Sequence, residues 1–153
     1  RAGISEVVMQ SFPDQRLYTS SHNADGSVAS TARTLADVNV VDKDGKAVLD
    51  SDGNQLVTLG VKSSLKNEVK NQQASLLSQT DWAIIRKADK GAAIPSNIQT
   101  WRDAIRTKAT EMETAIDNAA DTAAVEALFL KWTTDSDGKT TKSGILYDWP
   151  ELG

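Results

Sequence analysis

The spacing of apolar residues along the chain changes near residue 60. Before this point they occur in short runs rich in β-branched types, at residues 7–9, 17–18, 38–41, 47–49 and 56–59. Short runs separated by turn residues are typical of β-strands. After this point apolar residues recur every three or four positions, which is typical of amphipathic helices. The pattern predicts an α+β fold, with a small N-terminal antiparallel β meander followed by a C-terminal bundle of three to four helices.

Asp-Gly pairs separate the short runs of the β-rich part, residues 1–60. They occur at residues 25–26, 44–45 and 52–53, and the last two are eight residues apart. Glycine readily takes the positive φ that a hairpin turn requires, so this spacing favours successive tight turns around a short strand. We expect the segment from Ser20 to Arg33 to be a loose loop.

Two helices are predicted at the start of the helical part, residues 61–153. The first has Ser63 or Ser64 as its N-cap. Its apolar residues are Leu65, Val69, Leu76 and Leu77. The second begins at Thr80, whose hydroxyl can cap the free amides, with Asp81 beside the positive end of the helix dipole. Gly91 is a stop signal for this helix.

Two further helices follow. The third begins at Ser96, which forms a Ser-x-x-Gln capping box with Gln99, and runs to about Asn118. Its apolar stripe is Ile98, Trp101, Ile105, Met112 and Ile116. The fourth runs from about Thr122 to Trp132 behind Asp121 as its cap. The remaining tail passes through a polar turn at residues 137–138 and ends near Trp149 and Pro150.

Composition excludes several classes of function. The net charge is −4 and the pI is about 5.0, so no basic surface is expected that would bind nucleic acid or an anionic membrane. The chain has no cysteine, which removes disulfides, thiol nucleophiles and cysteine-bound metals. No apolar run approaches the length of a membrane span. The chain opens on Arg1, so we expect that residues precede it in the full gene product.

Catalytic and metal sites are not indicated by the sequence. His22 is the only histidine, and we interpret it as a solvated loop residue. Three Asp-x-Asp-Gly segments, at residues 42–45, 50–53 and 135–138, resemble parts of a calcium loop. The carboxylates that such a loop needs at its first and twelfth positions are missing, so turns are the better interpretation. We therefore expect no enzymatic activity, no cofactor and no metal.

An ordered set of residues in the C-terminal half resembles a known family. The set is Leu76-Leu77, Thr80-Asp81-Trp82, Arg86, Pro95, Trp101-Arg102, Ile105-Arg106 and Trp149-Pro150. It is similar to the phage tail assembly chaperone family, which also occurs as a module in tail-fibre assembly proteins. Trp101 stands where tyrosine is usual and Ile105 where leucine is usual. The stretch between Arg106 and Trp149 is longer than the family's short closing loop.

The resemblance implies a non-enzymatic protein of a tailed phage, located in the virion tail or in the host cytoplasm during assembly. Its partners would be tail or tail-fibre proteins, homo-oligomers are possible, and the β-rich part would be the variable attachment region. The residues carried over from the motif are Thr80, Asp81, Trp82, Arg86, Trp101, Arg102, Arg106, Trp149 and Pro150. An unrelated adaptor with a tryptophan-rich helical core is the alternative.

Roles for the matching residues follow from physical reasoning. We expect Trp82 and Trp101 to pack in a seam between helices. Arg102 and Arg106 lie one helical turn apart and repel mildly. A carboxylate outside their helix is therefore the expected partner, from Asp81, from Asp148 or from another protein.

Overall fold

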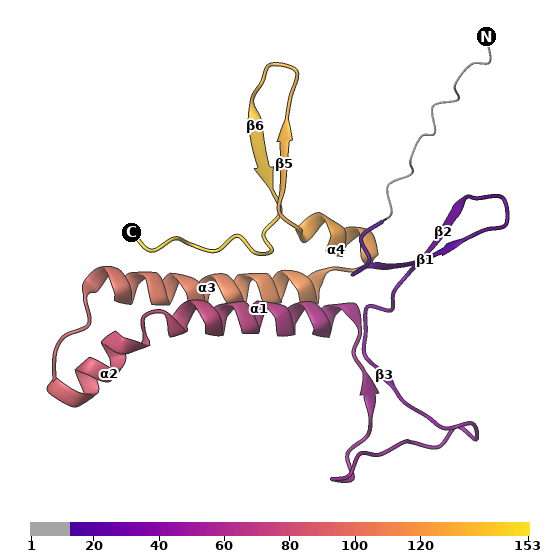
Figure 1. Cartoon of the computed structure of the whole chain (residues 1–153), viewed down its shortest axis with the longest axis horizontal. Coiled ribbons are helices and arrows are strands. Elements are labelled where there is room, and N and C mark those ends of the chain that lie inside the picture. Colours follow the sequence, from indigo (N-terminus) through magenta and orange to yellow (C-terminus); the bar gives the residue numbers. More distant parts are fainter. Residues whose placement is uncertain (1–12) are drawn as a thin grey trace.

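An antiparallel pair of helices forms the centre of the molecule. The computed structural model describes residues 13–153. Helix α1 (Val61–Ser78) lies alongside α3 (Ser96–Asn118), and the short helix α2 (Asp81–Lys90) joins them at one end (Figure 1). Helix α4 (Thr122–Leu128) follows α3 at the other end. All four predicted helices are present, and the predicted α+β fold is confirmed.

The core lies along the contact between α1 and α3 and continues to α4. Its fully buried large side chains are Leu17, Val69, Ile105, Met112, Ile116, Val125 and Leu146. Full burial of one such aliphatic side chain contributes about 1.5–3 kcal/mol. Because Leu17 lies inside this core, a residue from the β-rich part completes the helical core. The division of the chain at residue 60 stays a prediction.

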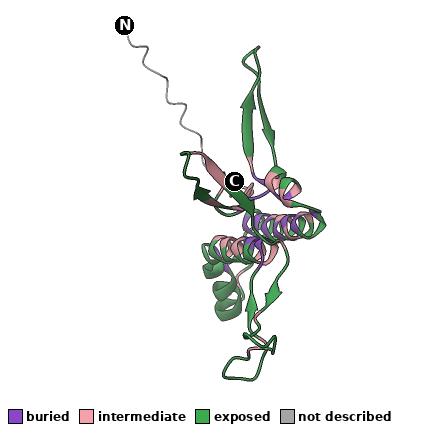
Figure 2. Cartoon of the chain, turned by 90° about the vertical axis from the view of Figure 1, so that its right-hand side faces the viewer, coloured by how far each residue is buried: buried purple, intermediate pink, exposed green. Residues whose placement is uncertain are grey.

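Among the described residues, three two-stranded antiparallel sheets project from the helices in different directions (Figure 1). They pair β1 (Tyr18–His22) with β2 (Val28–Ala32), β3 (Val38–Asn39) with β4 (Val57–Thr58), and β5 (Lys131–Thr134) with β6 (Thr140–Ser143). Figure 2 shows that burial is concentrated on the helices and that the hairpins are largely exposed. An isolated two-stranded hairpin is marginally stable in water, so contacts at the base of each hairpin, such as the packing of Tyr18 of β1 against the core, support these projections.

We define the arm as residues 38–58, which contain β3, β4 and the two turns between them. Three backbone hydrogen bonds form a ring at its centre: the amides of Val40, Val48 and Leu56 donate to Leu56, Val40 and Val48 respectively. The side-chain amide of Gln55 donates to all three ring carbonyls, at 2.8–3.1 Å. Backbone polar groups therefore hold the arm together, with very little apolar burial.

The Asp-Gly segments form turns, as predicted. Gly45, Gly53 and Gly138 have φ between 78° and 82°. In the turn at Gly45, the Asp42 carboxylate accepts from the amides of Asp44 and Lys46. Asp50 and Asp135 do the same in their own turns. These carboxylates therefore serve the turn backbone.

The cap of α1 differs from the prediction. Helix α1 begins at Val61, and neither Ser63 nor Ser64 is its N-cap. Asp37, at the base of the arm, accepts from the Gly60 amide at 2.8 Å and from the Ser63 hydroxyl at 2.9 Å. These hydrogen bonds lower the pKa of Asp37. The carboxylate is 23 residues from Gly60 in sequence, so local pattern reading could not identify it.

Acid should loosen the base of the arm. The lowered pKa of Asp37 means that its stabilising contribution is complete above its ordinary pKa of 3.8. The contribution is lost as the pH falls through the lower pKa of the folded state. We expect Asp37→Asn to reduce the acid dependence of amide-exchange protection at Gly60. Equal loss of protection with falling pH in both proteins would contradict this assignment.

Several other local predictions need correction. Ser96 does not cap α3, and the Gln99 side-chain amide donates to the Asp103 carboxylate, so no capping box forms. Residues 20–33 are largely the β1–β2 hairpin, and His22 ends β1 instead of lying in a loop. The Asp121 cap of α4 and the Gly91 stop of α2 are confirmed. The strand expected at residues 7–9 lies outside the described residues.

The fourth helix is shorter than predicted. Helix α4 ends at Leu128, and Trp132 lies in β5 with 63% of its surface exposed. Phe129, which directly follows the helix in extended backbone, is buried in the core, whereas Trp132 is not. Residues 131–143 are threonine-rich around an Asp-Gly turn, which is a hairpin signal. Only its turn was anticipated, and the β5–β6 hairpin was missed.

Candidate functional site

Arg102 of α3 holds the corner between α1 and α2. Its Nη1 donates to the Leu77 carbonyl at 2.7 Å, the Thr80 hydroxyl at 2.8 Å and the Asp81 carboxylate at 3.0 Å. Arg102 and Thr80 are both buried. Among the described residues, its Nε is a buried nitrogen without a hydrogen-bond partner. One cation thus joins the end of α1, the corner and the first residue of α2 to α3.

The expectation of a carboxylate partner outside the helix is confirmed for Arg102 and is wrong for Arg106. Asp81 is a partner of Arg102, as expected. Arg106 pairs with Asp103 on its own helix, at 3.0 Å, and not with a carboxylate outside it. Asp148 pairs with Lys142. Thr80 was expected to cap α2, but its side chain makes no capping bond and donates to Leu77.

Removing the guanidinium of Arg102 should destabilise the corner. Arg102→Met keeps an unbranched apolar chain but loses hydrogen bonds from a charged donor, each worth about 1.5–3 kcal/mol. We expect urea unfolding to show a loss of about 3 kcal/mol. Arg106→Met is the matched control, because its exposed pair with Asp103 contributes under about 1 kcal/mol. Equal stability of the two variants would contradict the role of Arg102.

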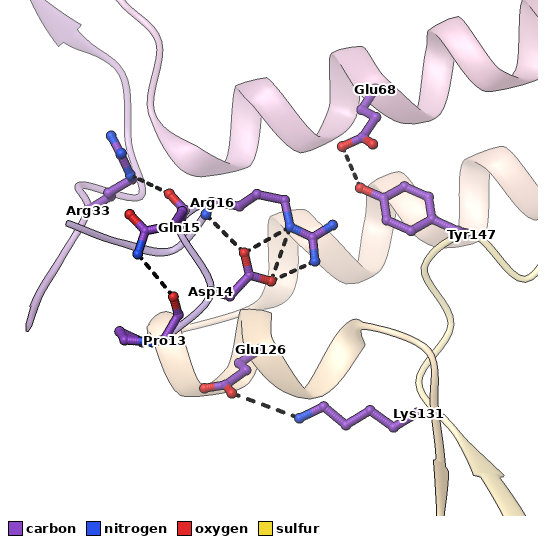
Figure 3. A network of polar contacts seen from close by, with 9 residues as sticks. All are labelled: Pro13, Asp14, Gln15, Arg16, Arg33, Glu68, Glu126, Lys131 and Tyr147. Atoms are coloured by element: carbon purple, nitrogen blue, oxygen red, sulfur yellow. Dashed lines mark hydrogen bonds and ion pairs between the residues drawn. The ribbon is translucent and has the colours of Figure 1, made fainter. Parts of the chain in front are cut away.

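The C-terminal strap, residues 145–153, contacts both α1 and α3. The Tyr147 hydroxyl donates to Glu68 at 2.6 Å (Figure 3), and the Trp149 indole donates to Gln72 at 2.7 Å. Glu68 and Gln72 lie one turn apart on α1, so alternate strap residues meet successive turns of α1. Burial is the main reason that the pKa of Tyr147 is raised.

On its other side the strap contacts α3. The Trp101 indole donates to the Pro150 carbonyl at 2.9 Å, and Asn97 donates to the Gly153 carbonyl at 3.1 Å. Trp101 is buried, and it lies beside Pro150 and Glu151. The closing Trp149-Pro150 of the motif therefore reaches both helices, despite the long stretch before it in sequence.

Trp82 and Arg86 are not part of this constellation. Trp82 was expected in the seam, but 50% of its surface is exposed. Helix α2 turns its small residue, Ala83, toward the protein, and Ala83 is its one buried residue. Arg86 is exposed. Hydrophobicity alone suggested a buried Trp82, and the orientation of so short a helix does not follow from its sequence.

The polar groups near the strap are already paired. A cavity of about 540 Å³ lies between β1, the base of the arm and α1, and its lining includes Arg16, Arg33 and Glu68. Figure 3 shows Arg16 paired with Asp14, Arg33 donating to the Gln15 carbonyl, and Glu68 accepting from Tyr147. These polar groups are therefore engaged in hydrogen bonds and ion pairs within the chain.

Residues 13–153 lack both a cluster of metal-ligating side chains and a helix suited to crossing a membrane. Within this range, no three His, Asp or Glu side chains are grouped so as to hold a metal ion. No described helix combines the length and the apolar character needed to cross a membrane.

Some residues of the site were not found from the sequence. Glu68, Gln72 and Asn97 receive or bind the strap, yet each is an ordinary polar residue on a helix surface. Their only sequence signal is that Glu68 and Gln72 are four residues apart, on one helix face.

No protein-family model matches this chain, and neither a curated protein nor a solved structure matches it.

Proposed function

We propose that this chain is a non-enzymatic protein of a tailed bacteriophage that acts through protein–protein contacts. It serves either as a small tail or fibre-associated subunit of the virion, or as a tail-fibre assembly chaperone that works in the host cytoplasm. Its partners are tail or tail-fibre proteins. The motif of the phage tail assembly chaperone family supports this proposal, because most of its residues take part in holding α2 or the strap.

The proposal depends mainly on the structural role of the motif residues. Six of its nine residues hold α2 or the strap in place: Thr80, Asp81, Trp101, Arg102, Trp149 and Pro150. On the helix held in this way, Trp82, Ile84 and Ile85 are 37–67% exposed. Exposed neighbouring apolar side chains of this size mark protein interaction sites. The motif is thus a scaffold that presents an apolar helix surface.

The alternative function is that of an unrelated adaptor. The burial of Trp101 favours it, because a structural role in the core explains this residue without any phage partner. The same exposed α2 surface would then bind a protein of another system.

Mass spectrometry of purified particles of the encoding phage tests the proposal. Presence in stoichiometric amounts identifies a structural subunit. Absence from particles, together with cross-links to fibre protein in infected cells, identifies a chaperone. Absence from both, or a gene that lies outside any phage or prophage, contradicts the proposal and leaves the adaptor.

A further inference from the structure

The arm exposes apolar side chains together with acidic turns. Five large aliphatic side chains of the arm are 40–55% exposed: Val38, Val41, Leu49, Leu56 and Val57. The two turns carry Asp42, Asp44, Asp50 and Asp52 against Lys43 and Lys46. Asp42 and Asp50 accept turn amides through their carboxylates. No hydrogen bond of the described residues uses the carboxylates of Asp44 and Asp52, so the arm offers a net negative apolar surface.

Helix α2 has the opposite character. Trp82 and Ile85 are three residues apart and share a face of the helix, and both are at least half exposed. Arg86, Lys87 and Lys90 lie on the same helix. These three cations take part in none of the ion pairs within residues 13–153. Asp81, one of the two acids of α2, is neutralised by Arg102. The α2 surface is therefore apolar and net positive.

The two surfaces cannot meet within one molecule. The arm leaves the helix pair at the start of α1, and α2 lies at the far end (Figure 1). Helix α1 has 18 residues and is about 27 Å long. A contact between the arm and α2 must therefore join two molecules.

We propose that the arm of one copy of this chain binds the α2 surface of a second copy, in a head-to-tail contact. Charge decides between this geometry and a symmetric dimer. Pairing α2 with α2 would bring Arg86, Lys87 and Lys90 against the same three cations, and pairing arm with arm would bring acids against acids. Like charges across an interface are costly. A head-to-tail contact joins different surfaces, and it closes into a ring or extends into a filament.

This inference rests on the proposed function for its biological setting. It deepens that function, because a tail is built of repeated copies of its proteins.

The test of the inference uses only the purified full chain. Sedimentation velocity over a concentration series should show reversible association beyond a dimer. Added salt should weaken association, because exposed charges are screened. The inference is overturned if the unsubstituted protein stays monomeric at every concentration. It is also overturned if added salt does not change the strength of association.

Charge-reversed variants test the two surfaces separately. Asp44→Lys with Asp52→Lys alters the arm and leaves the turn acceptors Asp42 and Asp50 in place. Arg86→Glu with Lys90→Glu alters α2. Each variant alone should associate at least about tenfold more weakly than the parent. Asp137→Lys is the matched control, because it changes the same position of the same kind of turn in the β5–β6 hairpin, and it should associate like the parent.

Two further experiments test whether the arm pairs with α2. The arm-reversed and α2-reversed variants should co-assemble when mixed, because the native arm of one meets the native α2 of the other and the reversed arm meets the reversed α2. A chain carrying both reversals should recover association through the inverted charges. Failure of both experiments in variants whose circular dichroism matches the parent overturns the inference. A monomer that still binds a tail protein overturns it too, while leaving the proposed function intact.

Discussion

Trp101→Ala is expected to destabilise the protein by about 3–5 kcal/mol, as truncation of buried tryptophans generally does. Trp101 is 5% exposed and its indole donates to the Pro150 carbonyl. The substitution therefore removes a packed ring and also releases the strap from α3. Urea unfolding followed by far-UV circular dichroism measures the effect.

A series at this position separates the two contributions. Trp101→Phe keeps most of the apolar volume but loses the hydrogen bond to Pro150, which alone is worth about 1 kcal/mol. Trp132→Ala is the matched control, because this tryptophan is largely exposed in β5. It should change stability by under about 1 kcal/mol. An equal loss for Trp101→Ala and Trp132→Ala would show that Trp101 does not support the core.

Gly144→Ala is expected to cost about 3 kcal/mol or more, from backbone strain and overpacking together. Gly144 has a φ of +85°, and a β-carbon there would lie 2.2 Å from the Phe129 carbonyl oxygen. This contact is between backbone atoms, so no side chain can move aside to relieve it. The chain would have to shift where the amides of Ile145 and Leu146 donate to Leu128.

Gly138→Ala is the control for the clash. Gly138 has a φ of +78°, and a β-carbon there would meet no atom within 4 Å. This variant should show only the cost of left-handed backbone, about 1–2 kcal/mol. The same urea unfolding experiment compares the two. Equal losses would mean that the close approach of Gly144 to Phe129 does not limit the fold.

Some short-range signals in the sequence predicted the local structure correctly. The Asp-Gly turns, the Gly91 stop and the Asp121 cap each depend on residues within a few positions, and all three are confirmed. Asp81 was one of three alternative partners expected for Arg102, from the repulsion between two arginines one turn apart, and this pair joins residues 21 apart in sequence. In the turns, the stop and the cap, the chemistry of one side chain and its immediate neighbours decides the outcome.

Features that depend on long-range contacts were missed. Asp37 reaches the start of α1 across the whole arm, and Gln55 fills a ring whose members are brought together only by folding. Trp82 was placed in the seam because it is large and apolar, but the smaller Ala83 faces the protein. Which face of a short helix is buried depends on its neighbours, and the sequence of the helix alone does not contain that information.

These observations give α2 a consistent role. Buried and paired residues fix the helix at its first residue, through Arg102, while the rest of the helix is left exposed. Exposed apolar residues contribute little to stability but much to binding when a partner covers them. The account therefore predicts that stability and partner binding separate on this helix.

The most direct test measures both properties on one variant, Trp82→Ser with Ile85→Ser. Its urea unfolding should match the parent, since both side chains are at least half exposed. Its cross-linking to tail or tail-fibre protein in phage-infected cells should be lost. Trp132→Ser should retain both properties. A double variant that binds its partner as the parent does would contradict the claim that α2 is the contact surface.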